Sequence, residues 1–256
     1  MRKPIPENSN TSTQMRLSTK NYILNALPEE DFNRLLPDLK PVYLPHGQVL
    51  YSPDEPIEYV YFPNNSVLSV VAITADGQSV ESGVIGREGM AGINVLMGVD
   101  SMPNQNIIAL ADGALRTSTA AVRREFKRGE ALHDLLLRFM HALMMQIGQT
   151  SLCNRLHANE ERLSRWLLMC HDRSETNELR LTQEFLSIML GANRSSVTMS
   201  AIALQNAGYI KYSRGLITVI NRQGLEDFTC DCYQANKQEY DRFQKQQVRE
   251  FLATPN

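Results

Sequence analysis

Arg194 and its neighbours have the residue types and spacing that recognise nucleic acid. Arg194 begins a predicted helix, and an arginine there can donate two hydrogen bonds to the O6 and N7 atoms of guanine. The side chains of Asn193 and Ser196, with the amide groups at the helix N-terminus, suit phosphate oxygens. The residues expected on or near the exposed N-terminal part of this helix, which would enter a major groove, are Arg194, Ser195, Ser196, Thr198 and Met199.

The predicted elements around these residues follow the order of a winged helix-turn-helix. They are a helix over Gln183 to Leu190, a turn at Gly191-Ala192-Asn193, a helix over Arg194 to Ala207, and a hairpin with strands Tyr209 to Tyr212 and Leu216 to Ile220. Thr182 is placed to cap the first helix, and Gly191 supplies the positive φ that the turn requires. The hairpin, called the wing below, carries Lys211 and Arg214, which we expect to contact DNA.

Positive charge gathers in the same segment. The whole chain has 26 Lys+Arg against 28 Asp+Glu, a net charge of −2, which excludes a chain that is basic throughout. Between Arg180 and Arg222, however, five basic residues stand against one acidic residue, Glu184, a local charge of +4. This local excess favours DNA binding over the alternative, an ordinary helical hairpin with a solvated polar face.

The four cysteines and His157 are the residues whose chemistry would involve metal ions. Cys153 and His157 are four residues apart on a predicted helix, which lets two ligands meet one metal, and Cys230 and Cys232 are placed as half of another site. A metal site needs three or four ligands, and these spacings match no zinc or iron–sulfur pattern. We therefore expect no metal and no cofactor, with all four cysteines as ordinary buried or partly buried thiols.

The segment between Leu39 and Thr117 is expected to form an antiparallel β-roll. Short apolar or alternating runs are separated by turn residues, a pattern typical of an antiparallel sandwich or roll. Asp76-Gly77 marks a hairpin, because this dipeptide adopts the positive φ of tight turns. The runs are Val42 to Leu44, Gln48 to Tyr51, Tyr59 to Phe62, Val67 to Ile73, Ser79 to Val84, Ile107 to Leu110 and Ala114 to Thr117.

A long helix is predicted over Glu130 to His157, a segment without proline and with Gly148 as its one glycine. Two apolar stripes follow its helical spacing. One stripe is Leu132, Leu136, Phe139 and Leu143, and the other is Leu137, Met140, Met144 and Ile147. Two stripes indicate two partners, and we expect the chain's own roll on one side and the same helix of a second subunit on the other. The alternative is a core helix covered within one chain.

Length and composition limit the remaining assignments. The chain has 256 residues, of which 43% are hydrophobic, and no run of about 18 apolar residues that would cross a membrane. Without an export signal, a cytoplasmic location is the expectation. The expected parts are a disordered arm over residues 1–20, an effector-type β-roll over 21–128, a dimerisation helix over 129–157, a winged helix-turn-helix over 158–225, and a C-terminal tail over 226–256 with no assigned role.

Two sequence segments resemble the Crp/Fnr family of transcription regulators. They are LTQEFLSIMLGANRSSV over Leu181 to Val197 and LQNAGYI over Leu204 to Ile210, followed by a wing. The resemblance covers about Asn21 to Leu225, and implies an α+β fold with a cyclic-nucleotide-binding-like jelly roll, a long dimerisation helix and a C-terminal winged helix-turn-helix. The family's base-contacting arginine falls on Arg194. A family acidic position falls on Ser195 and a later basic position on Met199, so the same operator sequence is not expected.

The resemblance also places an effector site in the roll, at Arg87, Glu88, Asn104 and Gln105. Glu88 in Gly86-Arg87-Glu88-Gly89-Met90 stands where the family's phosphate-binding cassette has its glutamate. The family's phosphate-binding arginine would fall near Pro103, where no arginine is present. A buried cyclic phosphate would then lack its bidentate partner, so we expect that cyclic AMP is not the effector.

The expected function is therefore a DNA-binding transcription regulator with no catalytic residues. Its expected partners are double-stranded DNA, a second copy of the chain, RNA polymerase and an unidentified small-molecule effector, with no membrane contact. The alternative is a ligand- or partner-binding module whose helix-turn-helix is vestigial. An enzyme that uses Cys153 and His157 is disfavoured, because no third group orients the pair.

Overall fold

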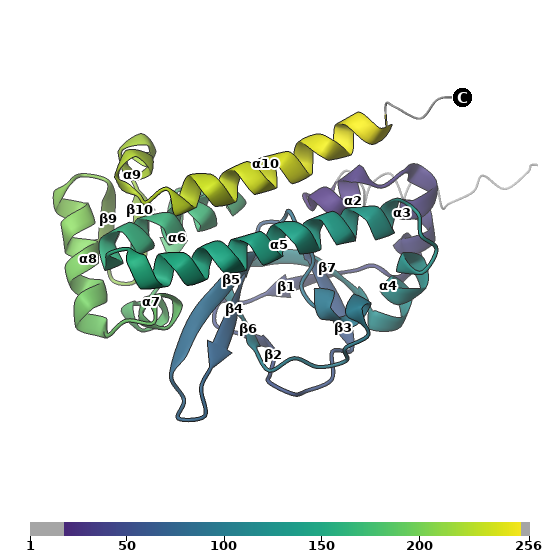
Figure 1. The fold of residues 1–256 in the computed structure, drawn as a ribbon, viewed down its shortest axis with the longest axis horizontal. Helices are drawn as coiled ribbons and strands as arrows, with labels where there is room; N and C mark the ends of the chain where they lie inside the picture. Colours follow the sequence, from purple (N-terminus) through teal and green to yellow (C-terminus); the bar gives the residue numbers. More distant parts are fainter. Residues whose placement is uncertain (1–17, 252–256) are drawn as a thin grey trace, which may run out of the picture.

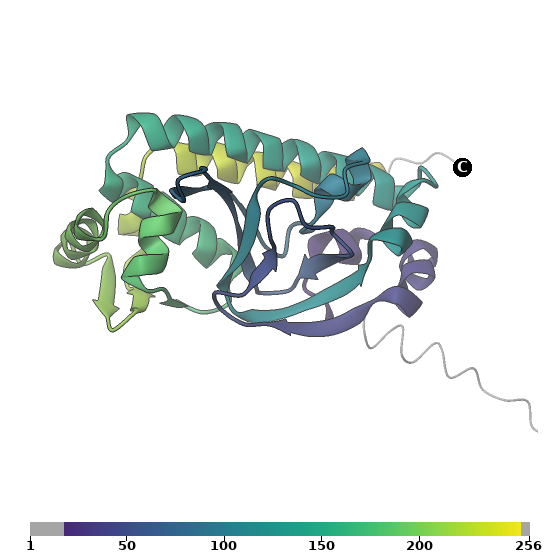
Figure 2. The same ribbon diagram turned by 90° about the horizontal axis from the view of Figure 1, so that it is seen from below.

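A computed structural model describes residues 18–251 of the chain. The disordered arm expected over residues 1–20 lies outside the described residues except for its last three. The described part is elongated, with a roll of strands in the middle, a helical domain at one end and two long helices that run along the molecule (Figures 1 and 2). No helix in residues 18–251 is long and apolar enough to cross a membrane.

Seven antiparallel strands of the described chain form the predicted roll. One sheet has the order β1-β7-β3 and the other β2-β6-β4-β5, and both contribute side chains to one core. The hairpin at Asp76-Gly77 is confirmed, since Ile73 pairs with Ser79 and Gly77 has a φ of +84°. The strands are β1 Lys40–Leu44, β2 Val49–Tyr51, β3 Tyr59–Pro63, β4 Val67–Ile73, β5 Ser79–Ile85, β6 Gln105–Leu110 and β7 Asp112–Ser118.

Short helices close one end of the roll and lead into the long helix. They are α2 Tyr22–Ala26, α3 Glu29–Leu35, η1 Leu36–Asp38, η2 Ile93–Met97 and α4 Thr119–Phe126, and the long helix is α5 Ala131–Leu156. The first predicted stripe of α5 is buried in the core of the roll, including Leu136 and Phe139. The second stripe is covered only in part within the chain, since Met140 packs against this core while Leu137 is 42% and Met144 60% exposed.

The C-terminal tail forms a helix that packs along α5. This helix, α10 Cys232–Phe251, lies beside α5 over much of its length in both ribbon views (Figures 1 and 2). Tyr240 and Phe243 of α10 are buried in the core that contains Phe139. On α5, Gln146 donates to the Tyr240 hydroxyl over 2.6 Å and also bonds both backbone groups of Val84 on β5. The tail is therefore part of the fold, and it provides a partner for α5 that sequence analysis did not assign.

The helical domain at the end of the molecule has the predicted helix, turn, helix and hairpin. Its elements are α6 Asn159–Arg173, β8 Glu178–Arg180, α7 Gln183–Leu190, α8 Arg194–Asn206, β9 Ile210–Ser213, β10 Leu216–Val219 and α9 Arg222–Phe228. The bounds of α7 agree with the prediction, and α8 is one residue shorter. Sequence analysis missed β8, which pairs with β10 to make the wing three-stranded.

Buried polar contacts join this helical domain to the roll. The indole Nε1 of Trp166 on α6 donates over 2.8 Å to the Glu81 carboxylate on β5, which also accepts a hydrogen bond from Ser69. The Nε of Arg173, at the end of α6, donates over 2.8 Å to Glu88 in the loop after β5. Since all these side chains are nearly fully buried, the two contacts help to orient α6 within the apolar core that it shares with the roll.

The burial of Glu81 makes the stability of this junction depend on pH. Desolvation raises the pKa of Glu81 to about 7 from its ordinary value of 4.5, against the opposing effects of the hydrogen bonds from Ser69 and Trp166. The folded protein therefore holds the Glu81 proton more strongly than the unfolded chain does. This contribution to stability is present at low pH and is lost as the pH rises through about 7.

We expect the unfolding free energy of the wild type to fall by about 3 kcal/mol relative to Glu81→Gln between pH 4.5 and 8. Denaturant unfolding of both proteins across this pH range measures the difference. Trp166 is the single tryptophan, so its fluorescence should titrate near pH 7 in the wild type and stay flat in the variant. Parallel pH profiles for the two proteins would contradict the buried, titrating carboxylate.

Candidate nucleic-acid interface and effector region

The turn between α7 and α8 is built by the capping residues that the sequence predicted. The Thr182 hydroxyl accepts a hydrogen bond from the Phe185 amide over 3.1 Å, and Gly191 ends α7 with a φ of +55°. The Asn193 side chain accepts from the Ser196 amide over 2.8 Å and so caps α8. The Asn193 carboxamide oxygen is thus occupied by the cap, while its NH₂ group remains available to an external acceptor.

Arg194 lies on the surface at the start of α8. Its Nη2 is 2.8 Å from the Glu184 carboxylate on α7, and both side chains are about two thirds exposed. Sequence analysis counted Glu184 as the one acidic residue of the segment but did not predict this pair. Exposed ion pairs contribute about 0–1 kcal/mol, so a stronger partner can displace Glu184 at little cost.

The other predicted residues of α8 differ in exposure. Ser195 and Met199 are exposed, while Ser196 and Thr198 are half-buried. The Thr198 hydroxyl donates over 2.8 Å to the Arg194 carbonyl, so only its acceptor positions remain for another molecule. The N-terminal face of α8 thus presents one cation, short hydroxyl side chains and an exposed methionine.

The wing adds Lys211 and Arg214, both exposed, with Arg214 at the turn of the hairpin at a φ of +49°. Arg180 on β8 is exposed as well. Arg222 does not belong to this group, because it forms ion pairs with Asp172 and with Glu226. The local charge counted from the sequence therefore overstates the positive charge that is free to face a ligand.

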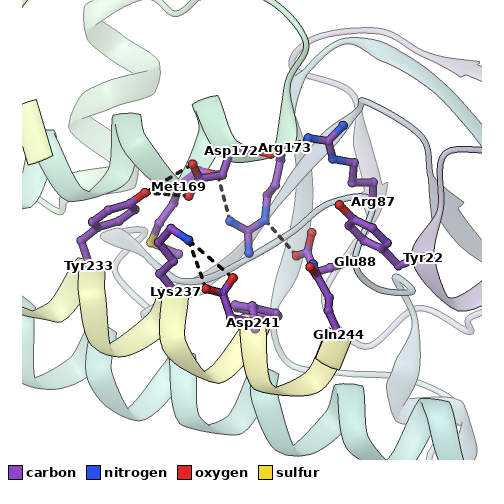
Figure 3. Close-up of a pocket in the computed structure, with 11 residues that line it drawn as sticks. Tyr22, Arg87, Glu88, Met169, Asp172, Arg173, Tyr233, Lys237, Asp241 and Gln244 are labelled. Carbon is purple, nitrogen blue, oxygen red and sulfur yellow. Dashed lines mark hydrogen bonds and ion pairs between the residues drawn. The ribbon is translucent and has the colours of Figure 1, made fainter. Parts of the chain in front are cut away.

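The structure separates the four residues expected to form one effector site. Arg87 and Glu88 line a cavity of about 220 Å³ between the loop after β5, α6 and α10 (Figure 3). The charges there are paired within the protein: Glu88 binds Arg173, Lys237 binds Asp241, and Arg87 donates to the Asp172 carbonyl over 2.7 Å. Glu88 therefore forms an ion pair with α6 and does not face a pocket enclosed by the roll.

Asn104 lines a second cavity, of about 140 Å³, between the roll and α5. Gln105, at the start of β6, lines neither cavity. Apolar residues dominate the lining of this second cavity, and its described lining contains no charged side chain. The polar lining residues are Asn94, Asn104 and Asn106, and the apolar ones include Met97, Met102, Met140 and Met144.

The three cysteines and the histidine that the sequence analysis considered as two incomplete metal half-sites, and expected to bind no metal, come together. Cys153, at the end of α5, and His157, the residue after this helix, meet Cys230 and Cys232 before and at the start of α10. One ligand atom from each of the four lies within 4.8 Å of every other. We call this group the thiol–imidazole cluster. Local spacing could not reveal it, because the two halves are more than 70 residues apart.

Comparison with known proteins identifies the helical domain. The family model described as the Crp-like helix-turn-helix domain matches residues 161–228, which include the predicted contact residues of α8 and of the wing. A search of the curated proteins found no match.

Solved structures share the fold over most of the chain at low sequence identity. FixK2 from Bradyrhizobium japonicum is 16% identical with a TM-score of 0.63, over 75% of this chain and 98% of that one. A candidate transcriptional regulator of the Crp/Fnr family from Eubacterium rectale is 16% identical with a TM-score of 0.62, over 80% and 96%. A candidate cyclic nucleotide-binding protein from Ruegeria pomeroyi is 16% identical with a TM-score of 0.56, over 87% and 98%.

These similarities agree with the α+β architecture of a roll, a long helix and a winged helix-turn-helix. The chain therefore contains a Crp-like helix-turn-helix domain over residues 161–228, and it shares its overall fold with solved structures of Crp/Fnr regulators.

Proposed function

We propose that the protein is a sequence-specific DNA-binding transcription regulator that acts as a homodimer on a two-fold symmetric operator. The observation that carries the proposal is the uncovered N-terminal face of α8, which presents Arg194 in a domain whose wing also carries exposed cations. In a winged helix-turn-helix this face enters the major groove. RNA polymerase is the expected partner of the DNA-bound dimer.

The residues of the surface divide into base-reading and phosphate-binding groups. Arg194 leaves Glu184 to bind guanine, and Met199 and Ser195 lie close to the neighbouring base edges. Phosphate contacts come from Lys211 and Arg214 of the wing, and from the Asn193 amide, the hydroxyl groups of Thr182, Ser196 and Thr198, and the helix N-termini. Phosphate contacts fix position without reading sequence, so the two groups are separable by experiment.

Replacement of Arg194 by alanine should weaken binding to the preferred duplex by about 1–3 kcal/mol, or roughly 5- to 150-fold, and should relax the preference at one base position. Lys211→Ala should weaken binding to all duplexes alike and lower the slope of log K against log salt by about one. Fluorescence anisotropy on a duplex selected from a random library, repeated over a salt series, measures both effects.

Arg242→Ala is a matched control, since Arg242 is also an exposed, ion-paired arginine but lies on α10. It should bind DNA as the wild type does. If no duplex is enriched by selection, or if Arg194→Ala keeps full affinity and preference, the alternative of a binding module with a vestigial helix-turn-helix would take precedence.

The exposed face of α5 is the proposed dimer contact. After the roll and α10 cover their faces, a row of large apolar side chains remains at the surface. They are Leu137, Met144, Met145, Ile147, Leu152 and Leu156. Gly148 lies within this row with no atom within 4 Å of the position of a Cβ, which lets a second helix approach closely. Pairing two such helices would set the two copies of α8 to read half-sites about one helical turn of DNA apart.

Met144→Glu should convert the dimer to a monomer, because the 60% exposed Met144 would place a charge in the apolar contact. Light scattering coupled to size-exclusion chromatography should give twice the chain mass for the wild type and the single mass for the variant. Ile220→Glu is the control, since Ile220 is 62% exposed but lies beside the wing, and it should remain dimeric. A wild-type monomer at micromolar concentration would refute this contact.

The cavity between the roll and α5 is the proposed effector site, and cyclic AMP is not its ligand. A cyclic phosphate needs a cation, and the described lining of this cavity has asparagines as its polar groups. Its volume of about 140 Å³ is also below the roughly 300–1,000 Å³ typical of pockets for drug-sized ligands. Calorimetric titration with cyclic AMP should show no heat of binding, and micromolar affinity would contradict the assignment.

A further inference from the structure

The thiol–imidazole cluster has the ligand number and spacing of a single metal site. The Sγ atoms of Cys153 and Cys230 are 3.6 Å apart, and the Sγ of Cys232 is 3.4 Å from the Nδ1 of His157. A tetrahedral zinc ion with Zn–S bonds near 2.3 Å and a Zn–N bond near 2.0 Å separates two sulfurs by about 3.8 Å and a sulfur from a nitrogen by about 3.5 Å. Both separations in the structure agree with this geometry within about 0.2 Å.

Other uses of these thiols fit the same distances less well. A disulfide joins two cysteines, and would leave Cys232 and His157 without a role in the cluster. An iron–sulfur cluster holds its ligands farther apart, because several iron and sulfide atoms lie between them. Four ligand atoms within 4.8 Å of one another leave room for one ion. Three thiolates and one imidazole are a ligand set that zinc forms in structural sites.

A hydrogen-bond donor next to the ligands supports a site made of thiolates. Gln149 Nε2 donates over 3.1 Å to the Sγ of Cys232, and the Oδ1 of Asp231 lies 3.9 Å from both the Nε2 of His157 and the Sγ of Cys232. Such contacts orient metal ligands and are typical of the surroundings of zinc sites. The three cysteines are at most 5% exposed, so the ion would be shielded from water.

Two buried arginines stand next to the cluster, and the carboxylate that interacts with Arg165, that of Glu81, lies beyond ion-pair distance. Arg162 and Arg165 of α6 are 9% and 2% exposed, and both interact electrostatically with Cys153. Among the described side chains neither has a carboxylate within ion-pair distance, and the Nε of each has no hydrogen-bond acceptor. Buried charges are ordinarily paired. A zinc ion with three thiolates and one neutral histidine has a net charge of −1, which supplies the missing counter-charge.

We propose that Cys153, His157, Cys230 and Cys232 bind one zinc ion that ties the start of α10 to the corner between α5 and α6. Two of the ligands precede the helical domain in the sequence and two follow it. The ion would fix the C-terminal end of α5 to the N-terminal end of α10. If the protein binds DNA as proposed above, the ion stabilises the corner on which the position of α8 depends.

The first test is the metal content of the full-length protein, which does not involve DNA. Protein purified without chelators should contain one zinc ion per chain, as measured by inductively coupled plasma mass spectrometry. Cys153→Ala and Cys232→Ala should each lose most of this zinc. Cys170→Ala is the matched control, because Cys170 is equally buried but belongs to the core around Trp166, and it should keep one zinc per chain.

The second test applies to the wild type and so does not depend on the folding of any variant. Cobalt added to chelator-treated protein should produce the intense visible bands of tetrahedral cobalt with thiolate-to-metal charge transfer, and zinc should displace them stoichiometrically. Zinc should also raise the melting temperature of the stripped wild type. A lack of zinc together with a lack of cobalt bands would overturn the proposal, as would a Cys153–Cys230 disulfide in anaerobically prepared protein. The outcome of each of these measurements is independent of whether the protein binds DNA.

Discussion

The helix α5 packs apolar side chains against several neighbouring elements at once. The positions of the roll and of α10 depend on these contacts. One face places Leu136 and Phe139 in the core of the roll, and an adjoining face meets Tyr240 and Phe243 of α10. Burial of each such side chain contributes about 1.5–3 kcal/mol relative to exposure to water. The apolar row around Met144 has no such cover within the chain, which is the physical reason for a second copy.

The helical domain shares an apolar core with the roll and is also joined to it by buried polar groups, which favour one orientation. Removing one partner of a buried ion pair such as Glu88–Arg173 costs about 3–5 kcal/mol, because the other charge is left unpaired. Apolar contacts tolerate sliding, whereas a hydrogen bond such as Trp166 to Glu81 has a narrow range of geometry. The turn at Gly191 adds a steric limit, since a Cβ there would lie 2.8 Å from Val80 of the roll.

Sequence analysis predicted most of the elements and few of the contacts between distant parts of the chain. Alternation and turn residues located the seven strands of the roll, and capping residues located α7 and α8 within a residue. The strand β8 was missed because three residues carry too little periodicity. The tail is polar and mixed in charge. It packs on α5 through a few buried residues such as Phe243, and the local sequence pattern does not reveal this burial.

The same distinction holds for the candidate sites. Arg194 was found because base recognition needs a particular residue at a particular place on one helix. Glu88 was assigned to an effector site by position, whereas its partner is Arg173, 85 residues later. The thiol–imidazole cluster needs the chain to return from α9 to the end of α5 before its ligands meet. Sequence spacing predicts sites that lie on one element, and the fold is needed for sites that join two.

The return of α10 to the roll gives the helical domain two covalent connections to the rest of the molecule, at the corner before α6 and at the segment between α9 and α10. A domain joined to the rest of a protein by one covalent connection can rotate about several axes. A domain joined at two points rotates mainly about the line that connects them. Any signal from the cavity between the roll and α5 would therefore move α8 along a single arc. Cleavage of the chain between Phe228 and Cys232 would remove one of these two connections, while the side-chain contacts between the helical domain and the roll would remain.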